Sequence, residues 1–308
     1  MNADFKGLTG ATAGTGTSAN LNGNIAGALS STWKANSLTQ TRNSNGGAVE
    51  CALNTIAQTT ASTASIDPAA TFTVDQAWGG KIQSAIDAAW AGDTVDVVAR
   101  AYTENVILNK ALDLVGLGSG TTTTSFTLNN GASVLPNSQG LTAPMVNVNT
   151  GAKIQDGVTL ASSGGTVNVG QGTYKENVVL GKSLTVSGAG QGTTTVNGGQ
   201  TGSVFTINPN VLATLSGMTI TNGMAVNGAG INNAGTVNLN GDSSITGNSA
   251  NIDGGGIENK GVVNLNSGSI TGNKANQPTP SGGGIWNSGT INGNTGIVTG
   301  NTPDDIKP

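Results

Sequence analysis

The chain has 308 residues, of which 49 are Gly, 42 Thr, 37 Asn and 25 Ser, so four small or polar residue types make up half of it. Charged residues are 9%, against about 25% in an ordinary soluble domain, aromatic residues are 3%, and the net charge is -4. This composition excludes a core of large side chains and the basic surface that binds nucleic acid. So few apolar residues can be buried only at regular positions, which predicts a repeat architecture.

Two absences narrow the chemistry. No histidine is present, which excludes Ser-His-Asp and Cys-His catalysis and histidine metal ligation. Cys51 is the one cysteine, so there is no intramolecular disulfide framework; we interpret it as a small buried apolar residue, with an intermolecular thiol as the alternative. No apolar run approaches the roughly 18 residues that cross a bilayer. Met1 to Gly10 holds no apolar signal-peptide stretch, so we expect any secretion signal to have been removed or never present.

Residues 1–70 are rich in Gly, Ala, Thr, Ser and Asn and match none of the repeats that follow. They are expected to form an N-terminal arm or irregular first coils, while 71–308 form the main body. The first segment of that body with helical spacing is Lys81 to Trp90, and Gly92 follows it as a stop. Its apolar residues are Ile82, Ala85, Ile86, Ala89 and Trp90. This pattern predicts a short capping helix near 81–90 that covers otherwise unpaired strand edges.

A long repeat begins at the same place. Lys81 to Thr123 aligns without a gap on Lys153 to Thr195, with 21 identities in 43 positions and an offset of 72 residues. The second copy contains Gly157 and Val158 and lacks the apolar stripe, so Lys153 to Ser163 is expected to form an ordinary coil.

Glu104 and Glu176 occupy equivalent positions of this repeat. Equivalence favours a shared structural role, such as accepting hydrogen bonds from turn amides, with calcium coordination as the alternative.

Shorter units recur from residue 228 to residue 301. GAGINNAGTVNLN, GGGIENKGVVNLN and GGGIWNSGTIN lie at offsets of 26 and 28 residues, and SITGN, SITGN and IVTGN lie between or after them. Their first residues are Gly228, Gly254, Gly282, Ser244, Ser269 and Ile297. Within each unit single polar residues separate apolar ones, as in Val237 and Leu239, which is the period of a strand with one buried face.

Strands this short bury their inner faces only when coil stacks on coil, with about 4.8 Å between paired strands. The predicted fold is all-β, a single-stranded right-handed parallel β-helix. Three inward columns are predicted, namely Ile231, Ile257 and Ile285; Leu239, Leu265 and Ile291; and Ile245, Ile270 and Ile297. Asn248, Asn273 and Asn301 are expected to form an amide ladder between coils.

These motifs resemble a known group, the pectin-lyase-like right-handed parallel β-helix superfamily. The run GDTVDVVARAYTENVILNKALDLVGLG from Gly92, with a second copy from Gly165, is similar to its opening coils. The GGGI-x-N and SITGN units are similar to repeats of adhesin-like surface proteins of archaea and bacteria. The resemblance covers about Thr71 to Asp305 and implies extracellular or cell-surface residence.

Many members of that superfamily are polysaccharide lyases or hydrolases, so an enzyme is the alternative. Hydrolysis needs two facing carboxyl groups, and uronate lyases need calcium-binding acids with an Arg or Lys base. Asp304 and Asp305 are adjacent acids and are interpreted as a solvated tail. Asp253 and Glu258 flank a glycine turn and could reach one ion, but an isolated acidic pair on a turn is interpreted as hydrated. Arg42 and Arg100 are the two arginines, in unrelated contexts.

No catalytic, cofactor or metal site is therefore assigned, and Trp286 is placed at an outward coil position. The threonine clusters at 121–124 and 193–195 lack the regular spacing that ice binding needs. We expect a non-enzymatic structural or adhesive surface protein, with a glycan or another cell-surface molecule as a candidate ligand. Self-association through the N-terminal arm or through the open coil near Asn301 is the further expectation, because unprotected strand edges recruit another chain.

Overall fold

The computed structural model describes residues 2–4, 18–20, 37–39, 71–74, 81–89, 91–277, 282–294 and 297–308. The chain divides into two units, Met1–Ala143 and Pro144–Pro308, and each is considered by itself. Cys51, Arg42 and Trp90 lie outside the described residues. The predicted boundary near residue 70 stays a prediction.

Parallel pairing joins the strands of Met1–Ala143. One sheet follows the order β10 (Ser133–Val134), β7 (Ala111–Gly116), β5 (Thr94–Val97), β4 (Thr71–Val74) and β3 (Ser37–Thr39). Three further pairs are β1 (Asn2–Asp4) with β2 (Ser18–Asn20), β6 (Asn105–Leu108) with β9 (Ser125–Leu128), and β8 (Thr121–Thr122) with the start of β11 (Leu141–Val148).

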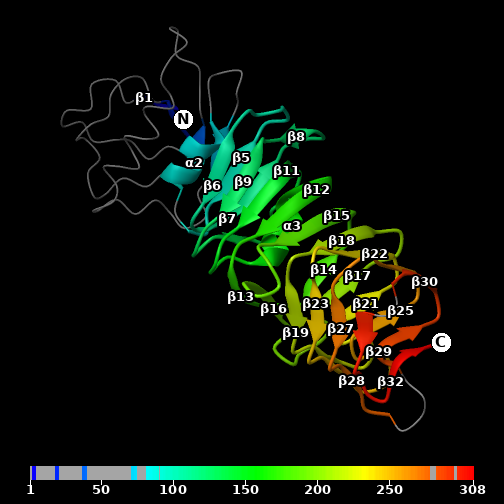
Figure 1. Ribbon diagram of the computed structural model, residues 1–308. Coiled ribbons are helices and arrows are strands. Elements are labelled where there is room, and N and C mark those ends of the chain that lie inside the picture. The colour runs from blue at the N-terminus through cyan, green and yellow to red at the C-terminus, as the bar shows by residue number, and fades with distance from the viewer. Residues whose placement is uncertain are drawn as a thin grey trace. The chain divides into compact units, whose positions relative to one another are not determined.

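In Pro144–Pro308 the strands of successive coils stack into parallel sheets (Figure 1). The first contains β12 (Ala161–Val169), β15 (Leu184–Gly188), β18 (Leu212–Ser216), β22 (Thr236–Asn240), β26 (Val262–Leu265) and β30 (Thr290–Gly293). The second contains β13 (Gly172–Lys175), β16 (Thr194–Asn197), β19 (Thr219–Thr221), β23 (Ser244–Thr246), β27 (Ser269–Thr271) and β31 (Val298–Thr299). The third contains β14 (Val178–Leu180), β17 (Phe205–Ile207), β21 (Ile231–Asn233), β25 (Ile257–Asn259), β29 (Gly282–Asn287) and β32 (Asp304–Lys307). A fourth joins β20 (Met224–Ala225), β24 (Ser249–Ala250) and β28 (Lys274–Ala275).

This arrangement confirms the all-β parallel β-helix. Alternate residues of the strands are buried, as in β22, where Val237 and Leu239 lie inside and their polar neighbours face outward. The narrow interior also explains the glycine triplets of the repeats. A Cβ on Gly256 would lie 2.5 Å from the carbonyl oxygen of Gly284 in the next coil, so no larger residue fits there.

The predicted inward columns are correct except at the last coil. Ile231, Ile257 and Ile285 stack as expected. Ile291 pairs with Val263, and Gly293 pairs with Leu265, so Ile291 does not extend the second column. Val298 takes the place predicted for Ile297 in the third column. Both errors come from the assumed alignment of the last coil with the coil before it. An alignment that is wrong by one residue places a side chain on the opposite face of the strand, and one that is wrong by two residues places it in another column.

The capping helix is confirmed as α2 (Ile82–Ala88), which packs against β4, β5 and β6. Ile82, Ala85 and Ile86 are fully buried. The predicted ordinary coil at Lys153 to Ser163 is wrong, because residues 154–160 form a second helix, α3 (Ile154–Leu160).

Gly157 is a packing requirement of α3. A Cβ at this position would lie 2.6 Å from Val148 Cγ2 and 3.0 Å from Val167 Cγ1. The helix therefore lies directly on the inner faces of the neighbouring strands and buries Ile154, Val158 and Leu160. Glycine lowers helix propensity by about 1 kcal/mol, but close packing on the sheet outweighs that local preference here.

Candidate functional site

Glu104 and Glu176 hold the N-termini of the two helices. The Glu104 carboxylate accepts hydrogen bonds from the backbone N–H groups of Ile82 at 2.9 Å and Gln83 at 3.1 Å. Glu176 accepts the equivalent bonds from Ile154 and Gln155, at 2.7 and 3.0 Å. A carboxylate at this place satisfies free amides and complements the helix dipole. The predicted role as an acceptor for backbone amides is confirmed.

Two more side chains of the long repeat perform matching structural roles. Gln83 exchanges two hydrogen bonds with the backbone of Ile107, donating to its carbonyl oxygen at 3.2 Å and accepting from its N–H at 2.7 Å. Lys110 donates to the carbonyl oxygen of Ala89 at 2.7 Å, at the helix C-terminus. Burial lowers the pKa of Lys110, and the charges of nearby acids partly oppose that shift.

The second copy repeats both contacts. Gln155 bonds the backbone N–H of Val179 at 2.8 Å and its carbonyl oxygen at 3.4 Å. Lys182 donates to the carbonyl oxygens of Thr159, at 3.0 Å, and Ala161. Burial lowers the pKa of Lys182 as well. Four charged side chains of the long repeat thus hold the two helices against the strands, namely Glu104, Lys110, Glu176 and Lys182.

The predicted asparagine ladder is confirmed in the short coils. Asn248 Nδ2 donates to Asn273 Oδ1 at 2.9 Å, and Asn273 Nδ2 donates to Asn301 Oδ1 at 3.0 Å. All three side chains are buried. The ladder continues to Asp305, whose Oδ1 accepts from the Asn301 backbone N–H at 2.8 Å and from its Nδ2 at 2.9 Å.

Asp304 and Asp305 are therefore not a solvated tail. They belong to β32, which pairs with β29, and both are half-buried. A carboxylate accepts hydrogen bonds but has no N–H group with which to continue an amide ladder. Asp305 thus closes this ladder, a contact that spacing alone did not predict.

A groove lies over the coils that contain β21 and β25. Its volume is about 620 Å³. Half of the residues that line it carry amide or hydroxyl side chains, and the others are Gly202, Met224, Ala225, Val226 and the charged pair Glu258 and Lys260. The amides and hydroxyls are those of Gln200, Thr201, Ser203, Asn227, Asn232 and Asn251. Glu258 is the one acid among the lining residues.

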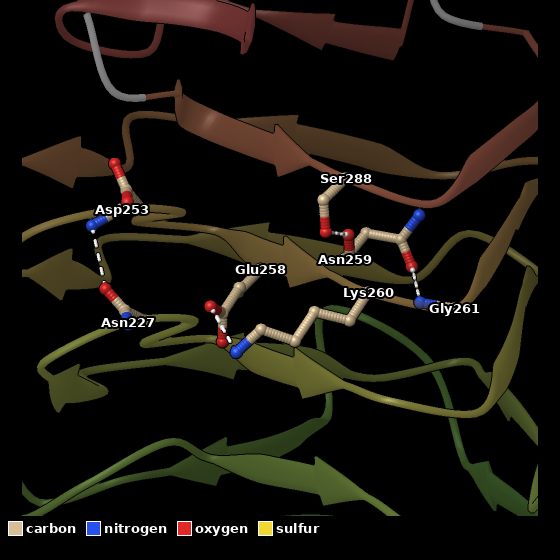
Figure 2. A network of polar contacts seen from close by, with 7 residues as sticks. All are labelled: Asn227, Asp253, Glu258, Asn259, Lys260, Gly261 and Ser288. Atoms are coloured by element: carbon tan, nitrogen blue, oxygen red, sulfur yellow. Dashed lines mark hydrogen bonds and ion pairs between the residues drawn. The ribbon is translucent and has the colours of Figure 1, made fainter. Parts of the chain in front are cut away.

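Glu258 is the unusual group of this groove. Only 2% of its surface is exposed, and Lys260 Nζ lies 2.8 Å from its Oε1. Its Oε2 is buried and has no hydrogen-bond partner among the described residues. The carboxylate lies close to Lys260 Nζ, and Asn227 and Asp253 lie on the adjacent turns of two successive coils (Figure 2). An acceptor in this state needs a donor that the described part of the chain does not supply.

The interpretation of Asp253 and Glu258 as a hydrated pair is wrong for Glu258, which is only 2% exposed. The Asp253 backbone N–H donates to Asn227 Oδ1 at 3.2 Å, and the Asp253 carboxylate points away from that of Glu258 (Figure 2). Burial and, to a smaller extent, the charge of Glu258 raise the pKa of Asp253. The two acids influence each other electrostatically, but they do not face one another across a reacting group.

Comparison of the short repeats could have identified this groove. Asn232 and Trp286 are the register partners of Glu258 in the neighbouring coils, so the residue varies where the surrounding motif does not. Trp286 is half-buried, in agreement with the predicted outward position. Lys260 was not singled out, although its counterpart in the preceding repeat is Ala234. Variation at an outward position of a repeat shows that the fold does not require one particular side chain there.

Among the described residues, no group of three or more His, Cys, Asp or Glu side chains could hold a metal ion. Within the same part of the chain, no helix is long and apolar enough to span a membrane.

Fold and site together define a class, a parallel β-solenoid with a groove that contains a charged pair. No family model, curated protein or solved structure matches the chain. The resemblance to pectin-lyase-like proteins therefore rests on the sequence motifs and the β-solenoid fold.

Proposed function

We propose that this chain is a non-enzymatic structural or adhesive protein of the extracellular cell surface, as its resemblance to adhesin-like β-helices implies. The observation that supports this most is the use of its polar side chains. Asparagines bond from coil to coil, both in the buried ladder and on the outside, where Asn264 donates to Asn238 at 2.6 Å and Asn292 donates to Asn264 at 2.9 Å. Such walls make the solenoid a stiff support and leave few groups free for chemistry.

The acids support the same proposal. Glu104 and Glu176 hold helix N-termini, and Asp305 closes a ladder. A glycosidase needs two carboxyl groups across the substrate, whereas Glu258 is the one acid that lines the groove. Surface display is tested by labelling intact source cells with an antibody against residues 144–308. Labelling before lysis is expected; labelling that requires lysis would contradict the proposal.

A polysaccharide lyase or hydrolase is the second candidate. What favours it is a groove containing a buried carboxylate, a lysine and a nearby acid whose pKa is raised. Incubation with uronate and neutral polysaccharides, with calcium, distinguishes the two candidates. No new reducing ends or unsaturated products are expected; their formation, and its loss in Glu258→Gln, would establish the enzyme.

The proposed function includes self-association of the chain. Among the described residues, the sheets of Pro144–Pro308 end at β28, β30, β31 and β32, and exposed edges favour pairing with another chain. Head-to-tail contacts that do not close give filaments. Light scattering and electron microscopy, with and without residues 1–70, provide the test. Filaments are expected, and a strictly monomeric full chain at micromolar concentration would contradict self-assembly.

A further inference from the structure

The groove contains a charged pair that the fold does not require. Asn232 and Trp286 stand in register with Glu258 in the neighbouring coils, and all three positions lie in strands of one parallel sheet. Ala234 is the counterpart of Lys260 in the preceding repeat. The same strand therefore forms without the carboxylate and without the ammonium group.

The buried carboxylate also lowers the stability of the free protein. Glu258 is 2% exposed, Lys260 reaches its Oε1, and Oε2 has no donor among the described residues. A buried acceptor without a partner costs about 1–3 kcal/mol. The preceding coil avoids this loss of stability, because Asn232 stands there in place of Glu258. The unpaired oxygen therefore points to a hydrogen-bond donor that a ligand supplies.

The rim of the groove restricts the kind of ligand. Met224 and Val226 line the groove and are 42% and 57% exposed, and Ile252, beside Val226, is 39% exposed. Ile252 N–H donates to the carbonyl oxygen of Val226 at 2.8 Å, so two of these residues lie on successive coils. The rim is aliphatic, and no aromatic ring is among the residues that line the groove. An aliphatic rim above a carboxylate suits an alkyl stem that ends in an N–H donor.

Charge distinguishes this ligand from a neutral one. Asp253, Glu258 and Lys260 together carry a net charge of -1 when ionised. A cationic head group would neutralise the site, whereas a sugar would leave the negative charge uncompensated. Hydrogen bonds between a cation and a carboxylate are also roughly twice as strong as neutral ones.

We propose that this groove binds a lysine or arginine side chain of a partner protein. The ammonium or guanidinium group donates to Glu258 Oε2, and the alkyl stem lies along Met224, Val226 and Ile252. The Lys260 side chain pairs with Oε1 and is 53% exposed, so in the proposed complex its ammonium group turns into solvent and the head group of the ligand takes its place beside the carboxylate. The inference rests on the proposed adhesive function, for which it names the ligand class.

The test is a titration of the full chain, followed by the backbone amide NMR signals of Gly228, Asn232 and Asn251. The probes are Ac-Gly-Arg-Gly-NH2 and Ac-Gly-Lys-Gly-NH2, with the neutral citrulline peptide Ac-Gly-Cit-Gly-NH2 as control. We expect saturable shifts with both basic peptides and none with citrulline. Glu258→Asn, which installs the residue of the preceding coil, weakens binding by about tenfold or more. Lys260→Ala installs the residue found at the equivalent position of the preceding coil, Ala234. It is expected to strengthen binding about threefold because a competing cation is removed.

Glu258→Gln is the second variant and keeps the size of the side chain, so that a misfolded Glu258→Asn protein would not leave the question open. Equal shifts in wild type and Glu258→Gln, or equal binding of the citrulline and arginine peptides, would overturn the proposal. Saturable binding of maltose in place of the basic peptides would also overturn it and reassign the groove to a hydroxyl-rich ligand. Surface labelling is independent of this titration: a labelled protein that binds no basic peptide refutes the ligand class alone, and a binding protein found only after lysis refutes the surface function alone.

Discussion

The long repeat and the short coils use charged side chains in opposite ways. In the long repeat, Glu104 and Glu176 make the same pair of backbone hydrogen bonds in both copies. In the short coils, Glu258 is found in one coil and leaves an oxygen without a partner. A charge that recurs with its contacts holds the fold, whereas Glu258 interrupts a repeat, pairs only through Oε1 with Lys260 and leaves Oε2 without a partner, which is the basis of the proposed binding site.

The largest expected effect comes from the buried ladder, in which every rung is repeated. Asn273→Asp replaces an N–H donor with an acceptor opposite the carbonyl oxygens of Ile245 and Thr271 and places a charge inside the solenoid. We expect the unfolding free energy to fall by about 4 kcal/mol. Chemical denaturation followed by circular dichroism measures it.

Asn266→Asp is the matched control for this substitution. Asn266 donates to Asn240 Oδ1 on the exposed surface, so solvent replaces the lost bond, and a change below about 1 kcal/mol is expected. Equal losses of unfolding free energy in the two variants would show that the buried ladder stabilises the fold no more than the exposed asparagine pair does.

The second effect concerns the helix-holding carboxylates. Glu176→Ala removes both acceptors at the N-terminus of α3 and is expected to lower the unfolding free energy by about 3 kcal/mol. Lys175→Ala, at the exposed neighbouring residue, is the control, with a change below about 0.5 kcal/mol. Denaturation midpoints measure both. If Glu176→Ala left the unfolding free energy unchanged, Glu176 would not hold the fold, and the long repeat would not differ from the short coils in its use of charge.

The third effect is a pH dependence of stability. Burial raises the pKa of Glu176 above its ordinary value of 4.5, and this outweighs the hydrogen bonds from Gln155 and Ile154, which act in the opposite direction. Between 4.5 and the raised pKa the folded protein keeps a proton that the unfolded chain has lost. The unfolding free energy contributed by this group therefore falls as pH rises through that window and is constant above it.

Glu176→Gln tests this pH dependence because it removes the titrating group. Unfolding midpoints of both proteins, measured from about pH 4 to about pH 7, give the difference curve. We expect wild type to lose stability relative to the variant as pH rises just above 4.5. Parallel profiles would contradict the stated cause.

Much of the fold could be predicted from the sequence because repeats restrict register. The column of Ile231 and Ile257 and the ladder through Asn273 follow from spacing alone. The helix at Ile154 could not be predicted, because its stability comes from Glu176, 22 residues further on, and from close packing at Gly157. Local propensity does not contain either contribution.

The groove could be predicted only in part. The acids Asp253 and Glu258 stand out in the sequence, but alternation does not show that Glu258 is buried or that Oε2 lacks a partner. An outward-facing position becomes buried when neighbouring turns cover it, and this depends on the three-dimensional course of those turns. The coil that contains Glu258 can be identified from the sequence by comparing each repeat with its neighbours, because Asn232 and Trp286 stand at the equivalent positions.

The comparison between the two regions is tested most directly by measuring the stability of Glu258→Asn beside that of Glu176→Ala, by chemical denaturation under identical conditions. We predict that Glu258→Asn leaves the unfolding free energy within about 0.5 kcal/mol of wild type or raises it by about 1 kcal/mol, because an unpaired buried acceptor is removed. Glu176→Ala is predicted to lose about 3 kcal/mol. A loss of similar size in both variants would contradict the account, since Glu258 would then hold the fold as Glu176 does.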